Sequence, residues 1–208
     1  MKNLMMVLLS CCLVVTLASC SSKPIADDEQ RQIVEGIDRI AVLPVQIPVG
    51  EGKDRPTVEE EQLHAGARHA YSILQQELGG NEKIRMVSPS MLDNLKTGVQ
   101  GGFGGTIAGI GEQLDCDAVL LVTMKRFTQR QGGEMAVDAP ASASFSMNLY
   151  ETKTRSIIWV ADFNETQESL LENIFSFGKA RSRGFKWITV EDLVEQGMKE
   201  RLAELPYL

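Results

Sequence analysis

The stretch "CDAVLLVTMKRFTQR" (residues 116–130) decides the fold. After Asp117 it contains the apolar run "AVLLV" (118–122), and we interpret the residues from Met124 onward as alternating between apolar and polar. A continuous apolar run is typical of a strand buried on both faces of a sheet, whereas alternation is typical of a strand with one face in solvent. We therefore expect a long strand here, buried at its start and half-buried further on.

The segments that precede this strand predict two more strands and the helices between them. "IDRIAVLPVQI" (37–47) is a second apolar run and predicts a central strand, with Pro44 near its end because proline cannot donate to a strand ladder. Thr57 and Glu60 have the spacing of a capping box, which opens a helix that "LGGN" ends with a left-handed Gly79 or Gly80. A short strand over 83–89 and a short helix over 89–98 follow.

The segments after residue 130 predict an antiparallel hairpin and two closing helices. Residues 141–151 and 156–165 flank a tight turn at "ETKTR" (151–155), after the loop 131–140. Helices are expected over 166–177 and 189–205, the second capped by Thr189 with Asp192. The order predicts an α/β fold with a mixed sheet, β-α-β-α-β followed by the hairpin, with flanking helices and two C-terminal helices.

The amino-terminal residues indicate a membrane anchor. Lys2 precedes an apolar run that is too short to span a bilayer, and small residues precede Cys20 in "LASC". This motif resembles the lipobox of bacterial lipoproteins. The resemblance implies cleavage before Cys20 and acylation of its thiol and new amino group, including palmitate-type chains that together hold a protein durably at a membrane. Ser21 in place of aspartate implies transfer to the outer membrane.

The anchor divides the chain into three parts. Residues 1–19 are expected to be a lipoprotein signal peptide, 20–36 a lipid-anchored tether and 37–208 a single α/β domain. If flexible, the tether spans roughly 20–25 Å, so the domain stays near its membrane. Cys116 is then the one unmodified cysteine of the mature chain, and we expect it to be a small buried side chain.

Composition and motifs argue against nucleic-acid binding and against catalysis. A net charge of −7 gives no electrostatic basis for binding nucleic acid. His64 and His69 are too far apart around a helix to chelate a metal, and neither a nucleophile motif nor a carboxylate pair stands out. We expect no enzyme activity, no cofactor, no metal site and no small-molecule substrate.

The glycine-rich segment "GVQGGFGGTIAGIG" (98–111) does not have the spacing of a phosphate-binding loop. G-x-G-x-x-G from Gly102 requires glycine at Ile107, and no G-K-[ST] follows. We expect a connecting loop, with a helix beginning at Thr106. The alternative is a docking loop, since long loops often carry contacts. Its residues would be Gly101, Gly102, Phe103, Gly104 and Gly105.

"FGKARSRGFKWIT" (177–189) is the one basic segment. One interpretation is a solvated loop between helices whose Phe185 and Trp187 reach the core. The other is contact with lipid head groups, cell-wall polymer or an acidic partner. The contact residues would be Lys179, Arg181, Arg183, Lys186 and Trp187.

Three short pieces in order resemble one group of proteins: "IDRIAVLPV", "LDCDAVLLVTMKRF" and "NLYETKTRSIIWVADFNETQ". They are similar to bacterial envelope proteins with the anticodon-binding-like α/β fold. That group includes the amino-terminal domain of the Tol-system translocation protein B, the curli-secretion lipoprotein and the lipoprotein activators of penicillin-binding proteins. The glycine usual in the hairpin of that group is Arg155 here, which would be strained if the turn needs a positive φ.

These observations together predict a non-catalytic lipoprotein on the periplasmic face of the outer membrane. It would bind an envelope protein or another copy of itself as an assembly or accessory factor. The alternative is a subunit of an oligomeric secretion or export assembly.

Overall fold

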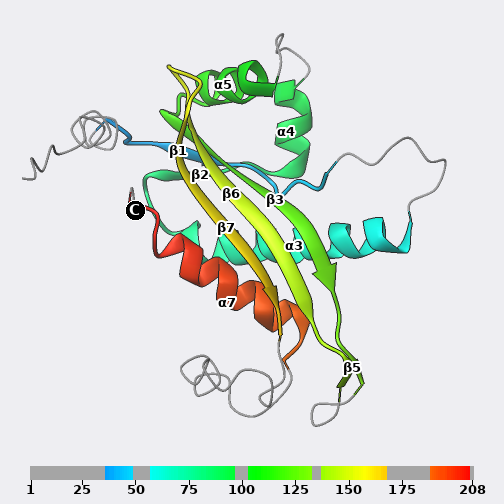
Figure 1. The fold of residues 1–208 in the computed structure, drawn as a ribbon. Helices are drawn as coiled ribbons and strands as arrows, with labels where there is room; N and C mark the ends of the chain where they lie inside the picture. The colour runs from blue at the N-terminus through cyan, green and yellow to red at the C-terminus, as the bar shows by residue number, and fades with distance from the viewer. Residues whose placement is uncertain (1–35, 49–56, 97–102, 133–136, 168–187, 207–208) are drawn as a thin grey trace, which may run out of the picture. The chain divides into compact units, whose positions relative to one another are not determined.

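A computed structural model describes residues 36–48, 57–96, 103–132, 137–167 and 188–206, which lie within the compact unit Ile33–Leu208. The described helices are α3 (Val58–Leu78), α4 (Pro89–Lys96), α5 (Phe103–Gln113) and α7 (Val190–Leu202) (Figure 1). The described strands are β1 (Ile40–Val42), β2 (Ile84–Met86), β3 (Ala118–Thr128), β4 (Gln131–Gly132), β5 (Val137–Ala139), β6 (Ser142–Glu151) and β7 (Ile157–Thr166).

The main sheet has the order β2-β1-β3-β6-β7. The β2, β1 and β3 strands are parallel, whereas β3, β6 and β7 are antiparallel neighbours. The predicted α/β class with a mixed sheet is therefore confirmed. The expectation of a plain loop over 131–140 was wrong, because β4 and β5 pair there as a separate two-stranded ribbon.

The β1 strand is short but interior, as predicted. Its regular ladder with β3 runs from Ile40 to Val42, and all three of its residues are buried. Beyond Pro44, which interrupts the ladder, the Gln46 N–H donates to the Val122 carbonyl at 2.9 Å. Proline therefore shortens this strand without turning the chain away from β3.

Both predicted capping boxes are present. The Thr57 hydroxyl accepts from the Glu60 N–H at 3.2 Å, and the Glu60 carboxylate accepts from the Thr57 N–H at 2.7 Å. Thr189 and Asp192 make the same exchange at the start of α7. The predicted left-handed cap of α3 was wrong, because Gly79 has φ −65° and Gly80 is not among the positive-φ glycines of the described residues. The chain there needs only a right-handed turn to enter β2.

The α5 helix begins at Phe103 and not at Thr106, so the expected start was wrong by one turn. The ring of Phe103 packs against Tyr150 of β6, which holds the first turn in place. Ile107 and Ile110 further along are buried against the sheet, as their spacing predicted. The glycines between Phe103 and Ile107 are helical because packing holds the residues on both sides of them.

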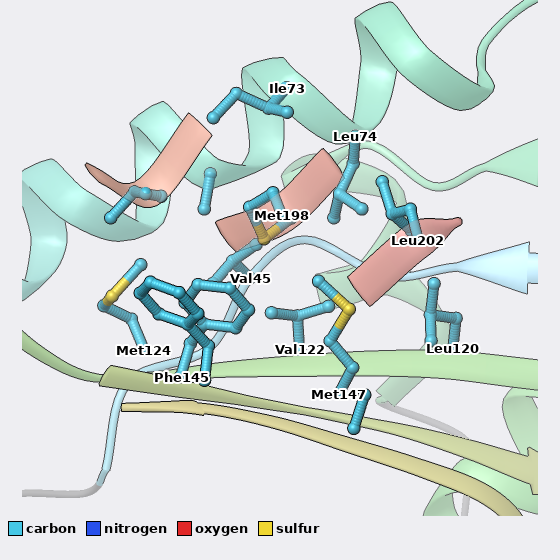
Figure 2. Close-up of a cluster of buried hydrophobic side chains, with 14 of the residues drawn as sticks. Val45, Ile73, Leu74, Leu120, Val122, Met124, Phe145, Met147, Met198 and Leu202 are labelled. Atoms are coloured by element: carbon cyan, nitrogen blue, oxygen red, sulfur yellow. The ribbon is translucent and has the colours of Figure 1, made fainter. Parts of the chain in front are cut away.

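The two faces of the sheet carry separate cores. The α3 and α7 helices cover one face, where side chains of both helices meet those of β3 and β6 (Figure 2). The residues labelled at this contact are Val45, Ile73, Leu74, Leu120, Val122, Met124, Phe145, Met147, Met198 and Leu202. The α4 and α5 helices cover part of the other face, over Ala41, Val119 and Leu121.

The helix expected over 166–177 lies almost wholly outside the described residues. Its first residue, Thr166, ends β7, and Gln167 donates from its N–H to the Ala141 carbonyl at 2.9 Å. The other C-terminal helix, expected over 189–205, is α7.

Candidate interaction surface

Most of the residues proposed from the sequence for contacts lie outside the described part of the chain. These are Cys20, Gly101, Gly102, Lys179, Arg181, Arg183, Lys186 and Trp187. Phe103, Gly104 and Gly105 are described, and they form the first turn of α5. The part of the proposed docking segment that is described is therefore helical and not a loop.

Phe103 is an exposed apolar residue beside the sheet. Its side chain is 62% exposed, although phenylalanine is among the residues most often buried. Its ring meets the ring of Tyr150 edge to face, with centroids 5.9 Å apart and planes at 69°. This geometry suits two aromatic rings, whose positive edges and negative faces attract.

Two exposed residues of β7 are also apolar. Ile157 is the cross-strand partner of Tyr150 and is 49% exposed, and Val160 is the partner of Asn148 and is 53% exposed. Because cross-strand partners lie on the same face of a sheet, these side chains project on the face of Tyr150. Phe103, Tyr150, Ile157 and Val160 are called the Phe103 patch below.

Partial burial marks Tyr150 as the inner member of the patch. Burial raises the pKa of its phenol above the ordinary value, so the group stays neutral through the physiological range. Tyr150 thus presents an apolar ring with a neutral polar tip, as is typical of tyrosines in protein interfaces.

Polar side chains lie beside the patch on the same face, held by a bulge in β3. The register shifts between Met124 and Arg126, and Lys125 is the extra residue. Lys125 Nζ lies 3.3 Å from Asp162 Oδ1, and Arg126 Nη2 donates to Asn164 Oδ1 at 2.6 Å. Both cations therefore reach to β7 and give the patch a polar border.

The sequence missed Tyr150, Ile157 and Val160 as surface residues. The apolar run "IIWVA" of β7 indicates a strand, but it does not tell which face a helix covers. The signal that could have found them is the position of β7 as the last strand of a meander, since such a strand often lies at the edge.

Both histidines and Cys116 lie in the described part of the chain. His64 is exposed, and His69 Nε2 lies 3.2 Å from the carbonyl oxygen of Glu191, so it joins α3 to α7. Cys116 is buried as predicted, and burial raises the pKa of its thiol, with Arg85 and Arg39 opposing that shift in part. Among the described residues, no group of three or more His, Cys, Asp or Glu side chains is arranged to hold a metal ion.

None of the helices in the described ranges combines the length and the apolar character that a bilayer crossing requires. No family model matches the chain, and no curated protein matches it either.

Solved structures provide distant likenesses in backbone course. One is the PelC dodecamer from Paraburkholderia phytofirmans, with 13% identity, a TM-score of 0.43, and coverage of 82% of this chain and 86% of that chain. Another is the LpoB C-terminal domain from Escherichia coli, with 18% identity, a TM-score of 0.38, and coverage of 66% and 95%. A third is lipoprotein GNA1162 from Neisseria meningitidis, with 13% identity, a TM-score of 0.39, and coverage of 71% and 97%.

Proposed function

We propose that this chain is a non-catalytic lipoprotein, held at the periplasmic face of the outer membrane through Cys20. In this role the Phe103 patch binds another protein of the envelope, and the chain acts as an accessory or assembly factor. The observation that carries the proposal is the exposure of Phe103, Ile157 and Val160 around one partly buried tyrosine.

The patch has the composition of a small binding surface. Exposed apolar residues scattered singly are ordinary on a protein, but a contiguous group bordered by polar side chains is typical of an interaction site. Complete burial of one such side chain contributes about 1.5–3 kcal/mol, and Phe103 and Ile157 are already partly buried, so covering them supplies part of the free energy of a larger interface. Lys125 and Asp162 at the border supply polar contacts that select among partners.

The tether restricts where the partner lies. Residues 20–36 span roughly 20–25 Å if they are flexible, which keeps the patch close to the acyl anchor. The partner is therefore expected in the same membrane or directly beneath it. A short tether also raises the effective concentration of the patch toward membrane-bound proteins.

Site-specific photocrosslinking in living cells tests this proposal. A photoreactive amino acid at position 103 is expected to give a discrete adduct with one envelope protein. The matched control is position 58, because Val58 is 72% exposed at the start of α3, outside the patch, and should give no such adduct. Equal adducts at both positions, or none at 103, would contradict the proposal.

A point variant tests the same surface without a crosslinker. Phe103→Ser removes the exposed ring, and we expect the pull-down of the crosslinked partner to fall by roughly 10-fold or more, as loss of an aromatic anchor does. Val58→Ser should leave the pull-down unchanged. Self-adducts at multiples of the chain's own mass from position 103 would favour the alternative, a subunit of an oligomeric secretion or export assembly.

A further inference from the structure

The β7 strand is a long edge of the main sheet. It is ten residues long, whereas β2 at the opposite edge has three. A strand at an edge presents one row of backbone N–H and C=O groups that its own sheet does not pair. A long edge of this kind is a template for another strand.

The backbone register identifies the groups that point outward. Gln167 donates to Ala141, which is directly opposite in the β6–β7 ladder, so these two residues form a hydrogen-bonded pair. Because hydrogen-bonded and non-hydrogen-bonded pairs alternate in antiparallel ladders, the next outward-facing positions are every second residue from Thr166. These outward positions are Val160, Asp162, Asn164 and Thr166. Within the described ranges, no hydrogen bond is found to their backbone groups.

This stretch lacks the devices that usually prevent strands from pairing edge to edge. Lysine, proline and bulges are the common ones, and none occurs between Val160 and Thr166. The one charge among the outward positions, Asp162, is already met by Lys125 of its own chain. Glu165, the other charged residue of the stretch, would lie opposite Ala161 of a second copy in the register proposed below and not opposite another carboxylate, so like charges do not meet across the edge.

We propose that the occupant of this edge is β7 of a second copy of this chain, antiparallel, with Asp162 opposite Asn164 of the second copy. A twofold axis beside Phe163 then relates the two copies, which is the commonest symmetry of homodimers. The two main sheets become one continuous sheet, joined by about eight backbone hydrogen bonds, two for each hydrogen-bonded pair.

The side chains favour this register over its neighbours. This register pairs all four outward positions, with Val160 opposite Thr166. It also sets the Asp162 carboxylate opposite the Asn164 side-chain amide, which can donate a hydrogen bond to it. Centring the axis on Asp162 would bring two carboxylates directly opposite each other, which is destabilising. Moving the axis further, to Ala161, would set Asp162 against Val160 and leave a carboxylate beside an apolar side chain. Moving it the other way, to Asn164, would leave Val160 without a pairing partner among the described residues.

Pairing through β7 does not require the proposed function of the Phe103 patch. Phe103, Tyr150 and Ile157 lie outside the paired stretch 160–166, so three of the four patch residues stay free to bind a different protein in the dimer. Failure of the photocrosslinking experiment at position 103 would leave the β7 pairing untouched, and the reverse also holds.

Engineered disulfides test the register in the full-length chain. Directly opposite residues of a hydrogen-bonded pair have Cα atoms about 5.5 Å apart, within the range of a disulfide. Differently tagged Asp162→Cys and Asn164→Cys chains, expressed together, are expected to give a mixed disulfide dimer in the envelope. Val58→Cys is the exposed control and should give none. Absence of the mixed dimer, or a yield no higher than that of Asp162→Cys with itself, overturns the proposal.

A blocking variant tests the pairing without cysteines. The Val160 N–H points away from β6, so Val160→Pro keeps the β6–β7 ladder of the monomer. The proline removes an outward-facing N–H donor, and its ring occupies the position that the second strand would approach. We expect the molar mass of the purified full-length chain in detergent, measured by light scattering, to fall by about two-fold. Val58→Pro is the control, since proline is well tolerated at the first position of a helix. A wild-type monomer, or a Val160→Pro dimer with unchanged mass, overturns the proposal.

Discussion

Arg155 occupies a backbone conformation that arginine rarely adopts. It has φ 61° in the turn between β6 and β7, where its N–H donates to the Glu151 carbonyl at 3.0 Å. A left-handed conformation costs roughly 1–2 kcal/mol for a residue with a Cβ atom, and glycine avoids that cost. The strain expected from the sequence, where arginine replaces the usual glycine of the hairpin, is therefore present.

Arg155→Gly should stabilise the protein. The left-handed strain is relieved, and the extra flexibility of glycine in the unfolded chain offsets part of the gain, so we expect about 0.5–1 kcal/mol in the free energy of unfolding. Urea denaturation followed by circular dichroism measures it. Arg155→Ala keeps the Cβ atom and should bring no comparable gain. A loss of stability in the glycine variant would show that the Arg155 side chain stabilises the hairpin by more than the strain costs.

At the scale of elements, α7 approaches β7 so closely that only glycine fits at one point. A Cβ atom on Gly197 would lie 2.6 Å from Cε2 of Phe163. The Phe163 ring is itself buried and stacked on Phe145, with centroids 5.0 Å apart, so it cannot swing aside easily. The close approach of α7 to β7 therefore depends on the absence of a side chain at Gly197.

Gly197→Ala should destabilise the protein by about 1–3 kcal/mol, the usual cost of overpacking a core. Thermal or urea unfolding measures it. The matched control is Gly104→Ala in the first turns of α5, where an added Cβ meets nothing within 4 Å. That variant should be neutral or gain up to about 1 kcal/mol from helix propensity. Similar losses in both variants would mean that the Phe163 contact does not matter.

The sequence predicted elements well where their signals are local. Both capping boxes depend on neighbouring residues, and the structure confirms them, as it confirms the buried first half of β3. The alternation expected from Met124 was wrong in detail, because the bulge at Lys125 places two residues that are not buried between Met124 and Phe127. The start of α5 depends on the contact of Phe103 with Tyr150, which is far away in the sequence. The glycines around Phe103 therefore led to the wrong prediction that the helix begins later. The Phe103 patch was largely hidden for the same reason, because exposure of Ile157 follows from strand order and not from its neighbours in the chain.

At the scale of the whole molecule, the proposed anchor makes a direct prediction. Cys20→Ala should abolish both fatty-acid labelling and cleavage before residue 20, because the acceptor thiol is gone. Intact-protein mass spectrometry and fractionation of the envelope measure this. Ser21→Ala is the neighbouring control and should leave labelling and cleavage unchanged. An unaltered mass and location for Cys20→Ala would remove the basis for placing the chain at a membrane.

The fold class and the order of the strands along the chain could be predicted from the sequence. The order of the strands within the sheet was harder to predict. Alternating strands and helices followed by a hairpin predict a mixed sheet, since parallel pairs need crossovers and hairpins are antiparallel. The placement of β1 between β2 and β3 rests on buried long-range contacts such as that of Ile40 with Ala118. Such contacts join residues far apart in sequence and leave no periodic signal of their own.

The position of α7 has a consequence for how the polypeptide is made. Val190, Leu193, Val194 and Met198 join the same core as Val42, so the last helix synthesised completes a core that the first strand begins. Until the C-terminal residues have emerged, that face of the sheet is open and the chain gains little from compaction. The growing polypeptide therefore has no closed core on this face until α7 has been synthesised.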